Sequence, residues 1–120
     1  MTELLRRQLI DTARRMAPAA LNRGGAGNLS VRCSEQGEHG YLITPTGMAY
    51  ATLEPEDLVF MALDGTQRGC RLPSSEWRFH RDLYVARPEA GAILHAHAPF
   101  ATSLACLRRD IPPFHYMIAR

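Results

Sequence analysis

Two histidines, His95 and His97, alternate with alanine at the end of an apolar run, and this spacing is suited to metal binding. The run from Gly91 to His97 follows Pro88 and begins with small and apolar residues, so we expect a buried strand. Residues two apart on a strand project to the same face, about 6.6 Å apart along the chain. Two imidazoles placed in this way can converge on one metal ion. The alternative is a pair of polar residues at a strand end that hydrogen-bond to the backbone.

A second group of residues, Ser74, Ser75 and Glu76, stands at the beginning of a segment with helical spacing. We expect a helix from Ser75 to about Ala86, whose free backbone N–H groups and positive dipole end would form an anion site. The serine hydroxyls would add donors suited to a phosphate. The alternative is structural, with a capping serine and an acid that complements the dipole. His80 follows Glu76 by one turn, but we favour a structural role for it, because the strand histidines are the better matched pair.

Three segments in the same order carry a resemblance to a known family, the class II aldolase/adducin family. They are Leu72–His80, His95–Ala98 and Pro112–Ala119, and the similarity extends from Leu9 to the last residue. The resemblance implies an α/β fold, a three-layer α/β/α sandwich with a mixed, mostly antiparallel sheet. The family domain is usually longer, so we expect residues 1–120 to be the N-terminal part of a single class II aldolase/adducin domain whose C-terminal part is missing.

The resemblance also assigns roles to individual residues. It implies a divalent cation, Zn²⁺ or another divalent metal, held by Glu76, His95, His97 and a further histidine from the part of the domain beyond residue 120. Glu76 would be catalytic as well, moving a proton on the substrate carbon, and Tyr116 would serve the aldehyde end of the substrate from a neighbouring subunit. Gly25 departs from the family pattern, which has a threonine that helps to place the aldehyde, so the aldehyde is left open. The positions that match the family's substrate phosphate-binding residues are Gly27, Asn28, Thr46, Gly47, Ser74 and Ser75.

The implied reaction is that of a metal-dependent lyase of carbohydrate metabolism, a class II aldolase. It would cleave a phosphorylated ketose similar to L-fuculose 1-phosphate into dihydroxyacetone phosphate and an aldehyde. Sister enzymes epimerise, decarboxylate or dehydrate sugar phosphates on the same metal site, and a non-catalytic adducin-like relative would use the fold for protein interaction. The metal-site residues argue against the non-catalytic alternative. An active site shared between subunits implies a homo-oligomer, and the family indicates a tetramer. The alternative for Tyr116 is a structural role as a buried aromatic side chain whose hydroxyl is hydrogen-bonded.

Composition argues against several other classes of protein. A formal net charge of +2 with scattered arginines gives no electrostatic basis for binding nucleic acid or a membrane. All 14 basic residues are arginines, so within this chain the carbonyl must be activated by a metal or by hydrogen-bond donors rather than by a lysine Schiff base. Cys33, Cys70 and Cys106 are odd in number and widely spaced, and no signal-peptide pattern begins the chain. We therefore expect reduced thiols and a cytoplasmic protein.

The remaining pattern predicts the elements that must position these groups. A glycine-rich turn, which lets backbone N–H groups approach an anion closely, leads into a strand. Hairpins indicate antiparallel pairing, with helices covering the two faces of the sheet. The predicted segments are a helix at 2–17, a glycine-rich turn from residue 22, strands at 31–34 and 40–44, a hairpin at 58–72, a helix at 75–86 and a helical segment at 101–107.

Overall fold

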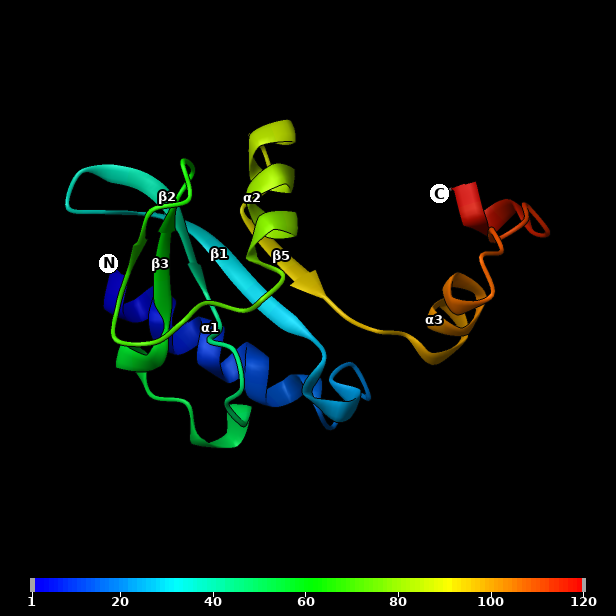
Figure 1. Cartoon of the computed structure of the whole chain (residues 1–120), viewed down its shortest axis with the longest axis horizontal. Coiled ribbons are helices and arrows are strands. Elements are labelled where there is room, and N and C mark those ends of the chain that lie inside the picture. Colours follow the sequence, from blue (N-terminus) through cyan, green and yellow to red (C-terminus); the bar gives the residue numbers. More distant parts are fainter. Residues whose placement is uncertain (1, 120) are drawn as a thin grey trace.

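The computed structural model describes residues 2–119, in which a five-stranded sheet carries α1 and α2 and a C-terminal segment extends away from it (Figure 1). The helices are α1 (Thr2–Met16), α2 (Trp77–Ala86) and α3 (Pro99–Cys106). The strands are β1 (Asn28–Glu35), β2 (Glu38–Ile43), β3 (Val59–Ala62), β4 (Gln67–Arg68) and β5 (Ala92–His95). Short 3₁₀ helices lie at Arg23–Gly25, Tyr50–Thr52, Pro55–Asp57 and Tyr116–Ala119. None of the helices within residues 2–119 combines the length and the hydropathy that a membrane crossing requires.

The strands lie in the order β4-β3-β2-β1-β5, and every pairing between the described strands is antiparallel. The predicted hairpins are confirmed, although β1 and β2 are longer than expected. Their turn is only Gln36-Gly37, and both residues have positive φ values, 52° and 81°. Such a two-residue turn matches the twist of the flanking strands, which lets the pairing continue to Glu35 and Glu38.

The first face of the sheet is covered by α1, where apolar residues recur with the helical period. Leu9, Ile10, Ala13 and Met16 are buried, as the predicted amphipathic helix requires. They pack against apolar residues of the three central strands, of which Leu42 and Phe60 are completely buried. Burial of each large apolar side chain contributes about 1.5–3 kcal/mol, so this layer is the larger part of the hydrophobic core.

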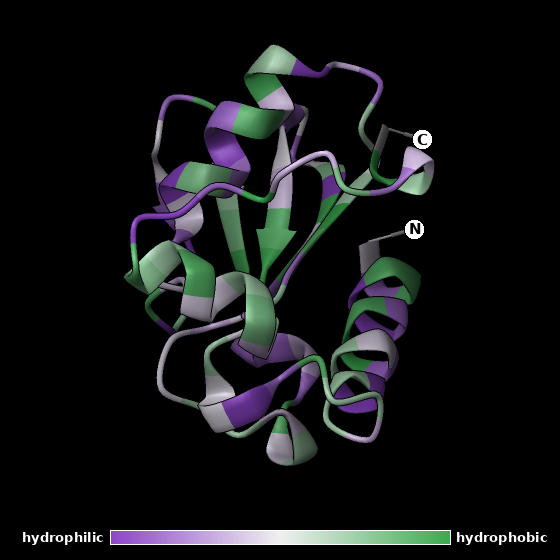
Figure 2. Cartoon of the chain, turned by 90° about the vertical axis from the view of Figure 1, so that its right-hand side faces the viewer, coloured by the Kyte–Doolittle hydropathy of each residue, from purple (hydrophilic) through white to green (hydrophobic). Residues whose placement is uncertain are grey.

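The second face is covered by α2 and contains a smaller apolar cluster. Tyr41, Ile43, Val59, Met61 and Tyr84 are its buried members. The strands therefore lie between two helices, with hydrophobic residues concentrated in the strands themselves (Figure 2). This arrangement confirms the predicted three-layer α/β/α fold.

The ends of α2 are fixed by polar contacts to neighbouring segments. The helix begins at Trp77, two residues later than predicted, with Glu76 in the N-cap position. At the other end, the guanidinium of Arg32 on β1 donates hydrogen bonds to the carbonyl oxygens of Tyr84, Arg87 and Ala90, at 2.8–3.1 Å. These carbonyls lie at or just beyond the helix C-terminus, where they have no partner within the helix.

The expectation that the histidine-bearing strand is buried was wrong. β5 pairs with β1 and is an outer strand of the sheet among the described residues. Ala92 and Leu94 are exposed, and Leu94 retains 44% of its surface, whereas Ile93 and His95 are partly buried. Apolar composition predicted a strand correctly, but only the sheet topology decides whether both faces of that strand are covered.

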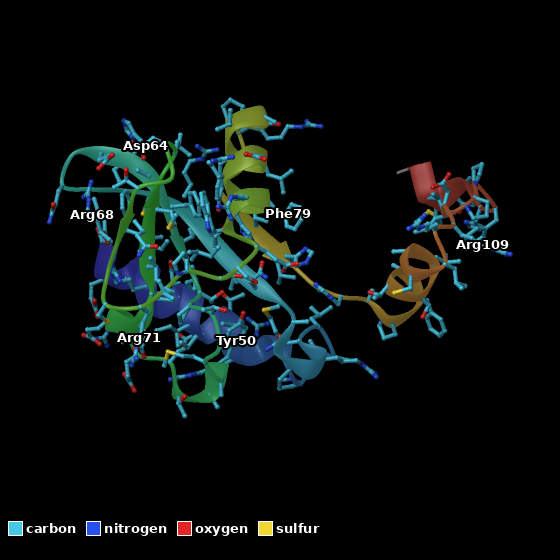
Figure 3. All side chains as sticks on the ribbon, in the orientation of Figure 1. Tyr50, Asp64, Arg68, Arg71, Phe79 and Arg109 are labelled. Atoms are coloured by element: carbon cyan, nitrogen blue, oxygen red, sulfur yellow. The ribbon has the colours of Figure 1, made fainter. Side chains whose placement is uncertain are left out.

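Residues 99–119 extend along the longest axis of the molecule (Figure 1). The predicted helical segment at 101–107 is confirmed by α3. Figure 3 shows the side chains of this segment, Arg109 among them, set apart from those around the sheet. Its apolar side chains are largely exposed, and the most exposed are Phe100, Leu107, Phe114 and Tyr116.

Candidate active site

Glu76, His95 and His97 converge, as the sequence predicted for a metal site. One potential ligand atom of each lies within 4.8 Å of the others. The Nε2 atoms of His95 and His97 are 3.0 Å apart. The carboxylate oxygens of Glu76 lie 3.1 Å from His95 Nε2 and 3.6 Å from His97 Nε2. Two imidazoles and a carboxylate gathered at the edge of a cleft fit a catalytic divalent cation such as Zn²⁺.

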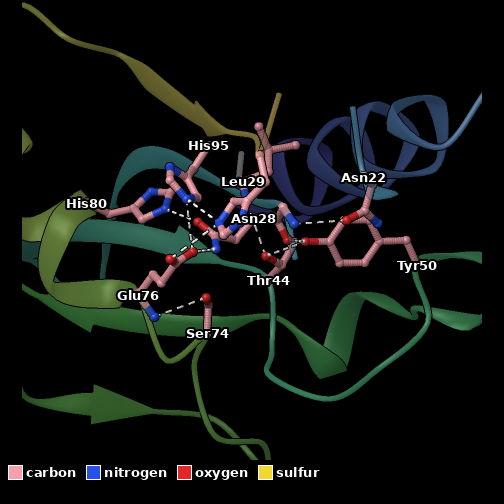
Figure 4. Close-up of polar contacts among 11 residues, drawn as sticks. Asn22, Asn28, Leu29, Thr44, Tyr50, Ser74, Glu76, His80 and His95 are labelled. Atoms are coloured by element: carbon pink, nitrogen blue, oxygen red, sulfur yellow. Dashed lines mark hydrogen bonds and ion pairs between the residues drawn. The ribbon is translucent and has the colours of Figure 1, made fainter. Parts of the chain in front are cut away.

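Three elements bring these ligands together. His95 is the last residue of β5 and pairs with Asn28, the first residue of β1. His97 follows two residues later, and Glu76 stands immediately before α2. The site therefore lies where one sheet edge meets the beginning of a helix (Figure 4).

His80 does not join the metal-ligand group and takes the structural role that the sequence favoured. It is completely buried, its Nε2 lies 2.5 Å from Asn28 Oδ1, and its Nδ1 lies 2.7 Å from Ser30 Oγ. Burial, and to a smaller extent the nearby His95, lower the pKa of His80, Glu76 acts in the opposite direction, and the net pKa is about 4. His80 is therefore neutral at physiological pH.

A cleft of about 490 Å³ adjoins the three ligands and collects the residues predicted to bind a phosphate. Glu76 and His97 are part of its lining. No lysine or arginine side chain is among its described lining residues, so its donors are neutral hydroxyl, amide and backbone groups. The predicted phosphate residues that line it are Gly27, Asn28, Thr46, Gly47, Ser74 and Ser75.

Backbone hydrogen bonds place the two segments predicted to bind a phosphate, Thr46–Gly47 and Ser74–Ser75, side by side. The N–H of Thr46 donates to the carbonyl of Leu72, and the N–H of Ser74 donates to the carbonyl of Thr44, at 3.1 and 3.0 Å. Ser74 Oγ also accepts the Glu76 N–H at 3.3 Å, a local bond in the turn before the helix. The predicted capping serine is wrong, because Glu76 is the N-cap residue and α2 has no side-chain cap hydrogen bond. Ser75 is exposed and lines the cleft.

The glycine-rich loop is held by side chains that the sequence analysis did not single out. Asn22 Oδ1 accepts the Gly27 N–H at 3.0 Å, and the Tyr50 hydroxyl donates to the Gly27 carbonyl at 2.6 Å (Figure 4). A Cβ at Gly27 would lie 2.8 Å from Met16 Cε, the movable end of a side chain, and 3.1 Å from the His95 carbonyl oxygen, so a side chain here would require its neighbours to shift. At Gly25, in contrast, φ is +68° and a Cβ would meet nothing within 4 Å. The loop is thus tight where it is anchored and open at the mouth of the cleft.

Residues 7–120 match the family model described as the class II aldolase and adducin N-terminal domain. The chain belongs to the class II aldolase and adducin family.

Three members of the class II aldolase and adducin family illustrate the similarity. A 5-methylthioribulose-1-phosphate/5-deoxyribulose-1-phosphate aldolase of Rhodospirillum rubrum is 56% identical over 115 residues, covering 96% of this chain and 50% of that protein. L-fuculose phosphate aldolase of Escherichia coli K12 is 48% identical over 115 residues, covering 96% of this chain and 52% of that protein. A solved structure of L-fuculose 1-phosphate aldolase superposes with a TM-score of 0.81 at 40% identity, covering 95% and 53%. The chain spans about half the length of the curated relatives it matches.

Among the described residues, Tyr116 is the predicted site residue that belongs neither to the cleft lining nor to the group of three potential metal ligands. It lies in the C-terminal segment of this class II aldolase family chain, and 72% of its surface is exposed. It is therefore not a buried aromatic in the described residues, which removes the structural alternative for a single chain. A role at the aldehyde end requires a second subunit and remains a prediction.

Proposed function

We propose that the protein is a metal-dependent class II aldolase that cleaves a phosphorylated ketose into dihydroxyacetone phosphate and an aldehyde. The observation that carries the proposal is the convergence of Glu76, His95 and His97 beside a cleft of neutral hydrogen-bond donors. The family and the names of the similar proteins support an aldol reaction.

Glu76, His95 and His97 would hold a divalent cation, which we propose to be Zn²⁺. When bound, the cation would act as a Lewis acid that polarises the substrate's ketone carbonyl. His95 is fixed at the end of β5 and His97 lies in the short connection to α3, so the two imidazoles approach from one side. Glu76 approaches from the start of α2 on the other side.

Glu76 is the only carboxylate among the described residues that line the cleft, and it is our candidate for proton transfer. In the cleavage direction a C–C bond breaks and its electron pair stays on the dihydroxyacetone phosphate half. The hydroxyl of the other half would lose its proton to the ionised Glu76 carboxylate as the aldehyde forms. Glu76 would return a proton to the carbon of the first half, and in the reverse direction it would remove that proton.

The phosphate would be bound by neutral donors rather than by a basic side chain. Thr46, Gly47 and Ser75 are exposed and line the cleft, so their hydroxyl and backbone N–H groups are the candidate donors. The N-terminal end of α2 adds the positive end of the helix dipole. These contacts would orient the substrate so that the bond to be broken lies beside Glu76.

The substrate class follows from what the named relatives have in common. The names of the R. rubrum relative and of the solved structure specify the 1-phosphates of three ketoses, 5-methylthioribulose, 5-deoxyribulose and L-fuculose. We propose a ketose 1-phosphate from this group. The absence of a side chain at Gly25 leaves room at the open end of the cleft for the part that becomes the aldehyde.

We also propose that the working enzyme is a cytoplasmic homo-oligomer, a tetramer, in which Tyr116 reaches the site of a neighbouring subunit. The exposed apolar residues of the segment around Phe114 and Tyr116 support burial against another copy. Sedimentation analysis of the purified protein measures the oligomeric state directly.

The reaction is tested by measuring dihydroxyacetone phosphate release from the three named ketose 1-phosphates, before and after treatment with a zinc chelator. We expect release from at least one substrate, loss of release with the chelator and recovery on adding Zn²⁺. Substrate conversion without dihydroxyacetone phosphate would instead identify a sister epimerase, decarboxylase or dehydratase. Stoichiometric metal with no conversion of any of the three would overturn the proposed reaction.

A further inference from the structure

Polar side chains of β1 and α2 interleave in the layer behind Glu76. Asn28 and Ser30 are two residues apart on the strand, a rise of about 6.6 Å. Glu76, His80 and Tyr84 are spaced by four residues along and just before the helix, a rise of about 6 Å per step. Because the two repeats nearly match, each strand residue fits between two helix residues, as Figure 4 shows for Asn28 between Glu76 and His80.

The carboxylate fixes the direction of the hydrogen bonds. Ionised Glu76 can only accept, so the Asn28 Nδ2 group must donate to Glu76 Oε2, at 2.6 Å. Asn28 Oδ1 then faces His80 Nε2 at 2.5 Å. An amide oxygen only accepts, and therefore His80 must carry its hydrogen on Nε2.

The same reasoning extends to the far end of the layer. With the hydrogen on Nε2, neutral His80 offers Nδ1 as an acceptor, and Ser30 Oγ at 2.7 Å must donate to it. The Tyr84 hydroxyl, 2.8 Å from Ser30 Oγ, then donates to that serine. The four side chains behind Glu76 are each at most 3% exposed. No buried side-chain nitrogen or oxygen among the described residues lacks a partner, so the network is fully satisfied in this one direction.

We propose that His80 is a positioning residue that, through Asn28, holds the Glu76 carboxylate toward His95 and His97. This inference rests on the role proposed for Glu76. Reversing the His80 tautomer would favour a turned Asn28 amide, which would set its oxygen against the Glu76 carboxylate. In the Nε2–H form His80 needs a donor at Nδ1, which Ser30, itself hydrogen-bonded to Tyr84, supplies. The low pKa of His80 agrees with this neutral form.

The test measures Zn²⁺ affinity by calorimetric titration of the purified protein and of His80 variants. His80→Leu removes the donor to Asn28, and we expect Zn²⁺ binding to weaken about 10- to 100-fold, as for other groups that orient metal ligands. His80→Gln keeps an N–H that can reach Asn28 Oδ1, and we expect an affinity within about threefold of the parent.

A matched pair of tyrosines separates positioning from general packing. Tyr84 and Tyr41 are both buried, their ring centroids are 5.0 Å apart, and each hydroxyl makes a hydrogen bond. The Tyr41 hydroxyl bonds the Trp77 carbonyl and not the network. We expect Tyr84→Phe to give an affinity between those of the parent and His80→Leu, whereas Tyr41→Phe should match the parent. Equal Zn²⁺ affinities for Tyr84→Phe, Tyr41→Phe and the parent would count against a role for the tyrosine.

A long-range ¹H–¹⁵N correlation spectrum of the imidazole tests the tautomer in the metal-free protein. We expect neutral His80 with its hydrogen on Nε2; an Nδ1–H tautomer or an imidazolium would overturn the inference. Folded His80→Leu with parental Zn²⁺ affinity would overturn it as well. If the parent binds Zn²⁺ and the variants weaken that binding as expected, but no ketose phosphate is cleaved, the proposed reaction would be refuted and the positioning role supported.

Discussion

The layer between the sheet and α1 is mainly apolar, whereas the layer between the sheet and α2 contains a continuous set of buried polar side chains. On the α1 side, Leu42 and Phe60 belong to the larger hydrophobic cluster. On the α2 side, Ser30 and His80 occupy completely buried positions between apolar neighbours. The two faces therefore have different roles. The α1 side supplies most of the hydrophobic stabilisation, whereas the α2 side has fewer buried apolar side chains and instead contains hydrogen bonds that extend to the site.

The largest expected effect is on kcat and concerns Glu76, which contacts the polar network on the α2 side. Glu76→Gln replaces the carboxylate with an amide of similar shape, and loss of proton transfer should lower kcat by about 10²- to 10⁴-fold. At saturating Zn²⁺ much of the metal should still be bound, with an affinity reduced at least as far as in His80→Leu, whereas His95→Ala should lose both metal and turnover. Steady-state kinetics together with metal analysis distinguish the two variants. Near-normal turnover by Glu76→Gln would show that its assigned role is wrong.

On the α1 side a core truncation should affect stability without affecting the site. Leu42→Ala should reduce the free energy of unfolding by about 2–5 kcal/mol, because Leu42 is completely buried in the larger cluster. Zn²⁺ affinity of the folded variant should remain parental. Urea unfolding and calorimetric titration give the two quantities, and a loss of Zn²⁺ affinity as large as that of His80→Leu would contradict the division between the faces.

The free energy of unfolding should depend on pH because of His80, which is buried on the α2 side. His80 has a pKa of about 4 in the folded protein and the ordinary 6.5 in the unfolded chain. Between these values the unfolded state binds more protons, so the stabilisation is complete above about pH 6.5 and is lost as the pH falls toward 4. The loss should approach about 3 kcal/mol.

Urea unfolding at a series of pH values measures this loss. The control is His80→Gln, which has no titrating imidazole at this position and should show a correspondingly smaller dependence. Identical pH profiles for the parent and the variant would assign the effect to other groups.

The smallest expected effect lies on the outer surface of α1. Arg7 and Glu3 form an exposed i,i+4 ion pair at 2.9 Å. Arg7→Ala should change the free energy of unfolding by only about 0.3–0.5 kcal/mol, because water screens the charges. High salt should remove most of the difference between the variant and the parent. A change of several kcal/mol would mean that α1 contributes through more than its buried face.

The sequence predicted the parts of the site that are local in the chain. The alternation of His95 and His97, and the place of Glu76 before a helical pattern, are visible within a few residues. The exposure of β5 was not visible, since it depends on which strands flank it in the sheet. Proline and apolar spacing likewise predicted both main helices but misplaced the beginning of α2 by two residues.

The buried network illustrates what single-sequence analysis misses. Ser30 and His80 are 50 residues apart, and their contact depends on the register between β1 and α2. A signal was nevertheless present: His80 and Tyr84 follow Glu76 at helical spacing, and Ser30 follows Asn28 at strand spacing. Each pattern alone is common in proteins, and only the packing of the two elements shows that they interlock.

Arg32 extends this interlocking to the far end of α2. Asn28, Ser30 and Arg32 alternate along β1 and bond, in turn, to Glu76 before the helix, to side chains in its middle and to carbonyls at its end. Separation of α2 from β1 would break all these bonds together, so the pair should behave as one cooperative unit in which the α2 amides exchange with solvent only when the whole fold opens. In the proposed reaction, any adjustment of Glu76 would then be confined to its own side-chain torsions, with the helix as a fixed frame.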